Sequence, residues 1–483
     1  MVNAIKFLVI AGEWRFLPLH FFALSGEIEF ETIVSVFENI YLKKSSSALY
    51  FVKSTSIFLN DPINQSFKTS EMAHNRTPDR RIFLSDISKL SLLGMLSTSA
   101  KSAPFTAALA KQAAKNGLLA GPYLQCLTPN EVTIMWITNE NAFSYVEYGG
   151  KVFIYKKAHH NEDGLIDANN RINAVTIRDL PPDTLCQYQI ITTEILDFQP
   201  YEVKFGETVK SPVYKFKTPK VNEETVKWVV MNDIHDHPES VTQLLYQLGS
   251  KGNDKDYDFV VFNGDAFSFV ESEQQIVDHL LTPCGNVFAH ELPFYLNRGN
   301  HETRGSFARH LKDYFYYPDN HYYSAFTKGP VRFVMLDTGE DKLDDNWTYS
   351  GLTAFDQYRE KEALWLEKEI EKPEFKKAPF RVVMMHIPPF YSSDWHGSEE
   401  CRRLFAPLFK KGKIDLLICA HLHRYSVHDP DPATHPYPII IGGGPTTGKR
   451  TLIKVNADRM HLNLQVLRDD GAEVGKYALK SRS

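Results

Sequence analysis

Five short clusters rich in aspartate, asparagine and histidine stand out between residues 233 and 423 of the sequence. Each directly follows a run of apolar residues that predicts a buried strand. In order, they are Asp233-Ile234-His235, Asn263-Gly264-Asp265, Arg298-Gly299-Asn300-His301-Glu302, His386-Ile387-Pro388-Pro389 and Ala420-His421-Leu422-His423. Any one of them alone is more often a helix cap or a buried histidine than a functional site. The recurrence of five such clusters is what points to chemistry.

The chemistry that these side chains favour is metal binding. Burying many ionisable groups at strand ends costs free energy for each charge left unpaired, and bound cations remove that cost. Mixed imidazole, carboxylate and carboxamide ligands suit Zn, Mn or Fe better than Ca or Mg, and the set is too large for one tetrahedral ion. We therefore expect two metal ions, about 3.5 to 4 Å apart.

The elements that must position these clusters are predicted to form an α/β domain. From residue 226 to about residue 470, apolar runs such as Trp228-Val229-Val230-Met231 alternate with helical stretches, for example the amphipathic segment Arg359 to Lys372. Such runs are typical of strands buried on both faces of a sheet. Because ligands bind at the carboxyl ends of strands in open α/β sheets, the five clusters should converge in space.

The segment before this domain has a different periodicity. Between residues 119 and 220, short alternating runs such as Val132-Thr133-Ile134-Met135-Trp136 are separated by Pro, Asn, Asp and Gly. This pattern predicts an all-β sandwich of about a hundred residues. We expect this region to serve as a packing or spacer domain.

The ordered clusters resemble those of the calcineurin-like metallophosphoesterases, the superfamily that includes the purple acid phosphatases. The segment Gly121-Pro122-Tyr123-Leu124-Gln125, with Trp136 and Leu180-Pro181-Pro182-Asp183-Thr184, resembles the fibronectin type III-like domain that precedes the catalytic domain in purple acid phosphatases. The resemblance implies an α/β (α+β) sandwich of two mixed sheets flanked by helices, preceded by an all-β fibronectin type III-like sandwich. It also implies a hydrolase of phosphate esters.

The resemblance also assigns roles to individual residues. It implies two divalent or mixed-valence metal ions (Fe, Zn or Mn), which would polarise the phosphoryl group and lower the pKa of a bound water. The seven candidate ligands are Asp233, His235 and His423 for the first metal, Asp265 as a bridge, and Asn300, His386 and His421 for the second.

Four further residues complete the expected site. His301 would act as the acid near the leaving oxygen, and Glu302 would orient it. Arg298 would form a bidentate contact with phosphate oxygens or, alternatively, a surface ion pair. His396 is a further candidate for contact with the substrate.

Four departures from the family pattern are visible. Purple acid phosphatases have a tyrosinate ligand where this chain has Ser268, and they lack the histidine that this chain has at His235. We therefore expect no purple charge-transfer band. Ala420 replaces a glycine, which should be tolerated, and Cys186 stands at the place of the corner tyrosine, with Tyr188 two positions later.

The expected function is hydrolysis of small phosphomonoesters, as by an acid phosphatase. The alternatives are a phosphodiesterase or nucleotide-hydrolysing activity at the same site, and a non-catalytic metal-binding scaffold, which would require a missing ligand or acid. Aromatic residues in three predicted loops could stack on a nucleoside or aryl group, or could pack the domain or face the β-sandwich instead. These loops contain Tyr314-Phe315-Tyr316-Tyr317, His321-Tyr322-Tyr323 and the segment Tyr391 to His396.

The remaining features concern the environment of the protein. The formal net charge of -5 makes long nucleic acid a poor partner. The five cysteines are scattered singly, which predicts buried thiols and leaves one disulfide open. No stretch has the roughly 20 apolar residues that a membrane helix needs.

The beginning of the chain suggests export. Arg80-Arg81 followed by the moderately apolar run Leu90 to Ala100 resembles a twin-arginine signal, although it could also open an ordinary helix. We therefore expect residues 1–71 to be an upstream extension without a clear fold, residues 72–118 an export signal and linker, and residues 471–483 a tail. The protein would be periplasmic or extracellular, or otherwise cytoplasmic.

Overall fold

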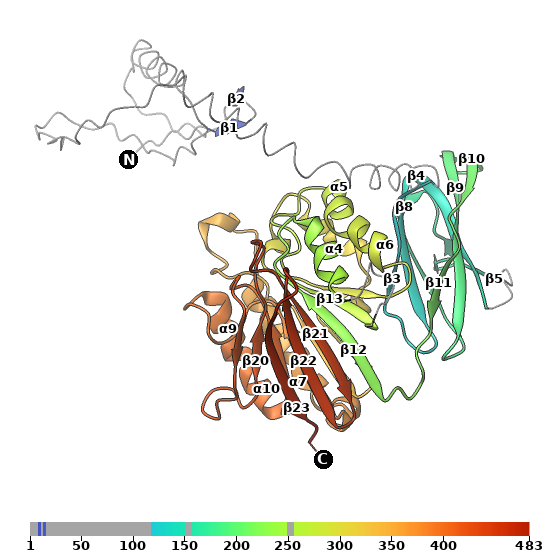
Figure 1. Cartoon of the computed structure of the whole chain (residues 1–483). Helices are drawn as coiled ribbons and strands as arrows, with labels where there is room; N and C mark the ends of the chain where they lie inside the picture. The colour runs from blue at the N-terminus through green and yellow to red at the C-terminus, as the bar shows by residue number, and fades with distance from the viewer. Residues whose placement is uncertain (1–7, 11–12, 16–116, 151–155, 249–255, 483) are drawn as a thin grey trace, which may run out of the picture. The chain divides into compact units, whose positions relative to one another are not determined.

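The computed structural model describes residues 8–10, 13–15, 117–150, 156–248 and 256–482 (Figure 1). The chain divides into two compact units, residues 1–95 and 96–483. The described residues of the first unit form one antiparallel hairpin, β1 (Leu8–Ile10) with β2 (Glu13–Arg15). The twin-arginine segment at Arg80 and Arg81 lies outside the described residues, so the export signal and the extension stay predictions.

The region between residues 117 and 217 is built almost entirely of strands. Its main sheet has the order β10-β9-β4-β3, with β11 paired to β9 and with β5 and β8 paired to β4. The strands are β3 (Leu118–Gln125), β4 (Val132–Gly149), β5 (Lys156–Ala158), β8 (Asn170–Ile177), β9 (Leu185–Gln199), β10 (Glu202–Lys210) and β11 (Tyr214–Lys217), with a small hairpin of β6 (Asn161–Glu162) and β7 (Leu165–Ile166).

The long strand β4 organises this region. Its first half pairs with β3 and β8, and its second half pairs with β9. The sheet encloses a core that includes Trp136, Val146 and Tyr188. The expected all-β region is therefore present, whereas its assignment as a fibronectin type III-like domain stays a prediction.

Two six-stranded mixed sheets form the rest of the described chain. The first has the order β14-β13-β12-β21-β22-β23 and the second the order β15-β16-β17-β18-β20-β19. The first comprises β12 (Thr225–Met231), β13 (Phe259–Asn263), β14 (Phe294–Asn297), β21 (Thr451–Asp458), β22 (His461–Arg468) and β23 (Glu473–Lys480). The second comprises β15 (Ser324–Lys328), β16 (Val331–Leu336), β17 (Phe380–Met385), β18 (Leu416–Cys419), β19 (Ser426–His428) and β20 (Ile439–Ile441). Strands β12, β13 and β14 run parallel, as do β16, β17, β18 and β20.

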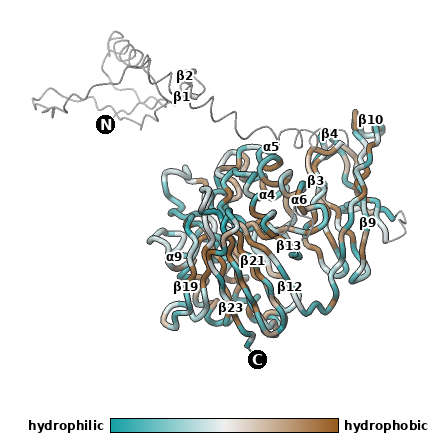
Figure 2. Tube along the Cα trace, viewed as in Figure 1, coloured by the Kyte–Doolittle hydropathy of each residue, from teal (hydrophilic) through white to brown (hydrophobic). Residues whose placement is uncertain are grey.

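Three apolar layers hold these sheets and their helices together. Alternate residues of β12 point to opposite faces, so Trp228 and Val230 belong to the core between the two sheets, while Val229 and Met231 face the helices. The hydrophobic stretches in Figure 2 follow these interior strands. The prediction of strands buried on both faces is confirmed.

Helices cover the outer face of each sheet. The first is covered by α4 (Pro238–Tyr246), α5 (Glu273–Ile276), η3 (Val277–Leu281) and α6 (Thr282–Val287), and the second by α7 (Phe355–Glu369), α8 (Pro373–Lys377), α9 (His396–Leu404) and α10 (Ala406–Gly412). Short helical turns occupy the loops: η4 (His301–Thr303), η5 (Ala308–Tyr314), η6 (Pro318–Asn320) and η7 (Trp347–Tyr349).

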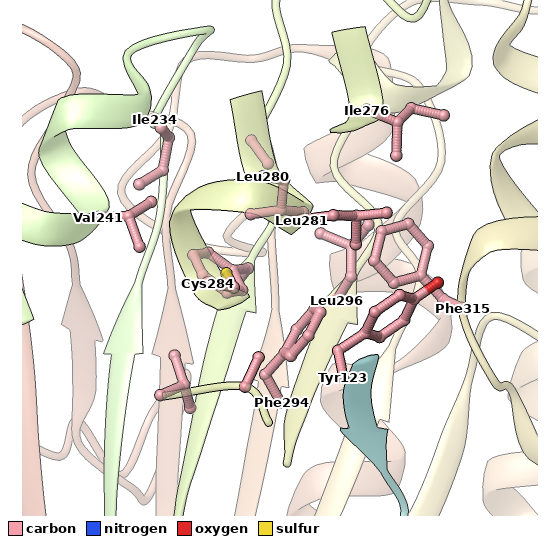
Figure 3. Packing of buried hydrophobic residues seen from close by; sticks show 14 of the residues in the cluster. Tyr123, Ile234, Val241, Ile276, Leu280, Leu281, Cys284, Phe294, Leu296 and Phe315 are labelled. Atoms are coloured by element: carbon pink, nitrogen blue, oxygen red, sulfur yellow. The ribbon is translucent and has the colours of Figure 1, made fainter. Parts of the chain in front are cut away.

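The strand-rich region packs directly on the first of these helical layers. Tyr123 of β3 lies beside Phe294 and Phe315 (Figure 3), and its hydroxyl donates a hydrogen bond to the Tyr314 carbonyl at 2.7 Å. The hydroxyl of Tyr188, the residue near the expected tyrosine corner, donates to the His290 carbonyl at 2.8 Å. Tyr188 therefore links the strand-rich region to the region of the two mixed sheets.

Three expectations need correction. Residues 471–483 were expected to form a tail, but Glu473–Lys480 form β23, which pairs with β22 in the first sheet. The helix expected at Arg359 to Lys372 begins earlier, at Phe355, because the side chain of Asp344 accepts hydrogen bonds from the N–H groups of Phe355 and Asp356. The disulfide left open does not form, since all five cysteines are free thiols. Among the described residues, no helix combines the length and apolar character that crossing a membrane requires.

Replacing Trp228 by Ala should destabilise the two-sheet core. The indole is fully buried, with its ring 4.8 Å from that of Phe333, so its loss should cost about 3 to 5 kcal/mol. Trp347, which is 85% exposed, is the matched control, and its replacement by Ala should cost less than about 0.5 kcal/mol. Urea unfolding of both variants measures the difference, and equal losses would contradict this assignment of the core.

Candidate metal centre

The candidate ligands all lie in loops that follow parallel strands. Asp233 and His235 follow β12, Asp265 follows β13, and Asn300 follows β14, all in the first sheet. His386 follows β17, and His421 and His423 follow β18, in the second sheet. Because the carboxyl ends of parallel strands meet at one edge of a sheet, the two sheets bring their polar loops to the same place.

The ligand atoms form two groups that share Asp265. Asp233, His235, Asp265 and His423 make the first group, and Asp265, His386 and His421 the second, with the ligand atoms of each group within 4.8 Å of one another. Asn300 joins the second group, since its Oδ1 lies 3.0 Å from His421 Nδ1. The structure thus brings all seven candidate ligands together.

The contacts within the two groups are short. In the first, Nε2 of His423 lies 3.2 Å from Asp233 Oδ1 and 3.0 Å from His235 Nε2. In the second, Nε2 of His386 lies 3.0 Å from Asp265 Oδ2. Metal-binding atoms of different residues therefore face a common centre in each group.

Several buried polar atoms at this centre have no hydrogen-bond partner. Two of them belong to candidate ligands and face the two groups, namely Asp233 Oδ1 and His386 Nε2. A buried polar atom without a partner is costly, and a cation bound to each group would satisfy these atoms. Nitrogen and oxygen donors of this kind fit Zn, Mn or Fe.

The electrostatics of the centre also demand positive charge. Burial disfavours ionisation of Asp265, but the charge of His386 outweighs it and lowers the pKa of Asp265 to about 2. Burial likewise opposes the charged form of His386, yet Asp265 raises the pKa of this imidazole to about 10. Burial and the neighbouring His386 lower the pKa of His421 to about 4, which leaves a neutral imidazole suited to metal binding.

The backbone of the ligand loops is strained. Left-handed φ angles occur at five of the seven ligands: 48° at Asp233, 48° at His235, 55° at Asp265, 73° at His421 and 52° at His423. Each such residue costs of the order of 1 to 3 kcal/mol, and such strain clusters at functional sites. The surrounding fold therefore holds these side chains in place at an energetic cost.

Glu302 supports the ligand loops instead of orienting His301. Its carboxylate accepts hydrogen bonds from the backbone N–H groups of Asp265 at 2.8 Å, Gly299 at 2.8 Å and Phe267 at 3.1 Å. Burial, followed by the charge of Asp265, raises its pKa to about 7. The contact expected between Glu302 and the His301 ring is replaced by these three bonds, because the short helix η4 directs Glu302 into the interior.

His301 lies at the pocket beside the metal centre and is oriented by other groups. Its Nδ1 donates to the Ser268 carbonyl at 2.7 Å, and its Nε2 accepts from Arg304 at 3.2 Å. Ser268 is held in turn by Asp236, whose carboxylate accepts the Ser268 N–H at 2.8 Å. Sequence reasoning missed Asp236 and Arg304. Asp236 directly follows the candidate ligand His235, which could have pointed to a role at the site. Its partner Ser268 is 32 residues away, so the sequence does not reveal the contact.

Arg298 does not face the pocket. Its guanidinium pairs with the buried Asp337 at 2.5 Å and lies 4.0 Å from the ring centre of Tyr322. The predicted phosphate contact is therefore corrected to a buried ion pair, because the carboxylate of Asp337 has no other cation within ion-pairing distance among the described residues.

His396 also contacts a residue outside the pocket. Its Nε2 lies 2.8 Å from Asp356 Oδ1, and it does not line the pocket. The neighbouring Trp395 lines the pocket instead, with its ring 4.9 Å from that of His421. The predicted contact of His396 with substrate is therefore corrected.

The pocket itself has a volume of about 420 Å³. It is lined by candidate ligands and His301, by aromatic residues of the loop expected to flank the site, and by Asp341, Leu422 and Arg424, which sequence reasoning did not assign to the site. The lining residues are Asp265, Asn300, His301, Asp341, Tyr391, Ser393, Trp395, His421, Leu422, His423 and Arg424. This volume suits a small ligand that reaches the metal centre.

Comparisons with known proteins agree with this geometry. Residues 226–425 match the model of the calcineurin-like phosphoesterase family. The chain is 24% identical to probable purple acid phosphatase 20 of Arabidopsis thaliana over 63% of this chain and 67% of that protein. It is 28% identical to a probable glycerophosphodiester phosphodiesterase GpdQ of Arcobacter nitrofigilis over 28% of this chain and 47% of that protein.

Solved structures show the same fold. The structure of purple acid phosphatase PPD1 from yellow lupin (Lupinus luteus) seeds is similar over 74% of both chains, with a TM-score of 0.56 and 16% identity. The structure of PhoD is similar over 76% of this chain and 89% of that chain, with a TM-score of 0.52 and 11% identity.

Replacing Gly264 by Ala should disrupt the metal centre. Gly264 has a φ of 86°, and an added Cβ would lie 2.3 Å from Nδ1 of His386, so this ligand must move. We expect bound metal to fall by at least half in elemental analysis of the purified protein. Gly285→Ala is the control, because an added Cβ there meets no atom within 4 Å. Normal metal content in Gly264→Ala would show that His386 is not a ligand.

Proposed function

We propose that this chain, which contains a calcineurin-like phosphoesterase domain and is related to the purple acid phosphatases, hydrolyses small phosphate monoesters with two metal ions. The domain makes the chain a hydrolase of phosphate esters. We further propose that the substrate is a monoester, that two metal ions are bound, and that particular residues act at the site.

The observation that carries the proposal is the pair of ligand groups that share Asp265 and open on one pocket. Two adjacent cations held in this way would clamp a phosphoryl group, polarise it and supply a nucleophile from water at neutral pH. His301 lines the same pocket, so an imidazole stands beside the place that the ester would occupy. No member of the expected ligand set is missing, which argues against a non-catalytic scaffold.

His301 is the proposed acid for the leaving oxygen. Its partners show which nitrogen carries the proton in the neutral ring: Nδ1 donates to the Ser268 carbonyl, and Nε2 accepts from Arg304. Donation to a leaving group requires a proton on Nε2 as well, in which case the contact with Arg304 opens. Asp236 acts as a positioning residue, because it holds the Ser268 peptide to which His301 is bound.

The monoester is favoured by the extent of the similarity. The match to a purple acid phosphatase spans 63% of the chain, whereas the match to the glycerophosphodiester phosphodiesterase spans 28%. Diester hydrolysis is the second candidate, since the same ligand groups serve both reactions and a diesterase differs in admitting a second ester arm.

Replacing His301 by Ala should lower turnover by about 10²- to 10⁴-fold while metal content stays near normal. His301 lines the pocket but belongs to neither ligand group, so its loss removes the acid and spares the metals. Steady-state kinetics and elemental analysis measure the two quantities. The control is His461→Ala, a half-exposed histidine on β22. Loss of metal together with activity would mean that His301 is a ligand.

The metal-loaded protein should hydrolyse p-nitrophenyl phosphate at least 10-fold faster than bis-p-nitrophenyl phosphate. The physical reason is that the second aryl arm of the diester must also fit beside the candidate metal centre. Chelation should abolish both activities, and restoring Zn, Mn or Fe should recover them. A faster reaction with the diester would replace the proposed monoesterase by a diesterase.

A further inference from the structure

Two large aromatic side chains are exposed at the metal pocket. Tyr391 is 44% exposed and Trp395 is 41% exposed, and both line the pocket that contains His301 and His421. Single exposed apolar residues are common on protein surfaces, but two aromatic rings lining one concave site suggest a binding surface. We call these two residues the aromatic platform.

Tyr391 is held by contacts with its neighbours while part of its ring stays exposed. Its φ of 67° is left-handed, which is unusual and strained for a bulky residue. The ring stacks on His428 with centroids 3.5 Å apart and planes within 5°. A residue kept in a strained conformation by such contacts is preorganised for binding.

The hydroxyl of Tyr391 is already used. It lies 2.5 Å from His435 Nε2, and His435 Nδ1 lies 2.9 Å from the carbonyl of Tyr437. Because that carbonyl only accepts, Nδ1 of the neutral ring carries the proton and Nε2 accepts from the Tyr391 hydroxyl. What Tyr391 offers to a ligand is therefore the surface of its ring.

The loop that carries the platform is anchored at both ends. On one side, Arg402 Nε donates to the Pro389 carbonyl at 2.7 Å, and its guanidinium lies 5.6 Å from the centre of the Phe390 ring. On the other, the Trp395 carbonyl accepts the Glu399 N–H at 3.0 Å at the start of α9.

Trp395 places the aromatic platform beside the candidate metal centre. Its ring meets that of His421 at 82°, with centroids 4.9 Å apart. His421 is a candidate ligand of the second metal, so a phosphoryl group at the metal centre would leave its ester oxygen close to an aromatic surface.

We propose that the aromatic platform binds a planar aromatic group in the alcohol part of the substrate, so that the enzyme favours aryl phosphates or nucleotides over alkyl phosphates. The inference rests on the proposed function and adds the substrate class. Stacking on an aromatic side chain accepts any planar ring and is strong enough to produce this preference.

Binding of two phosphonates tests the platform without turnover. The metal-loaded wild-type protein should bind phenylphosphonate about 5- to 50-fold more tightly than methylphosphonate in calorimetric titrations. Tyr391→Gly, which suits the left-handed backbone, and Trp395→Leu, which keeps an apolar side chain, should each remove most of this difference. Trp347→Leu, at an 85% exposed position that does not line the pocket, should retain it.

Kinetics of three esters identify the aromatic group. In the two platform variants, kcat/KM should fall about 5- to 50-fold for phenyl phosphate, for adenosine 5′-monophosphate or for both, mainly through KM, and less than 2-fold for glycerol 1-phosphate. Comparing each variant with the wild type on the same ester removes the intrinsic reactivity of the leaving group.

The outcomes separate the two proposals. Equal losses on all three esters, or unchanged preference for phenylphosphonate, would overturn the platform while leaving the phosphatase intact. A wild-type protein that hydrolyses none of the three esters would instead overturn the proposed monoesterase, and the phosphonate titrations would still decide whether the platform binds an aromatic group.

Discussion

The structure depends on the concentration of buried charge where two sheets meet. Asp233 and Asp265 are both almost completely buried, and they share their surroundings with the imidazoles of four candidate ligands. Two carboxylates at this depth are stable only beside positive charge, which explains why His386 has a raised pKa. Two buried polar atoms without hydrogen-bond partners, Asp233 Oδ1 and His386 Nε2, lie at the same centre. Two metal ions bound at these groups would satisfy both requirements.

The scaffold maintains this arrangement against strain. The backbone is left-handed at five of the seven candidate ligands. Glycines let the loops approach one another so closely that a side chain would not fit, as where Gly264 meets His386. Glu302 gathers the backbone of two loops with three hydrogen bonds, while Asn232 links Asp233 to the turn at Gly443. The packed core between the sheets supplies the rigidity that such loops require. The packing of the strands therefore keeps the candidate ligands in position.

The same principle explains the residues whose roles changed. Arg298, Glu302 and His396 stand next to pocket residues in the sequence, and each has a side chain suited to phosphate or proton chemistry. Each side chain instead contacts a group outside the pocket. Arg298 pairs with Asp337, Glu302 accepts hydrogen bonds from backbone N–H groups, and His396 contacts Asp356. Adjacency in sequence does not determine direction, because neighbouring residues of a turn point to different sides.

The sequence by itself determined the types of residue available and their places after apolar runs, and from these the α/β fold and the five polar clusters could be predicted. The choice of seven ligands within those clusters came from the resemblance to the calcineurin-like metallophosphoesterases. Strand periodicity and the rule that parallel strands end at a common edge are local or nearly local properties, so one chain is enough to read them. Only the tertiary structure decided which nitrogen of His301 carries its proton, that Asp236 holds Ser268, and that Tyr391 and Trp395 line the pocket. These contacts join residues tens of positions apart, and their geometry follows from packing and loop strain, which no pattern along the chain records.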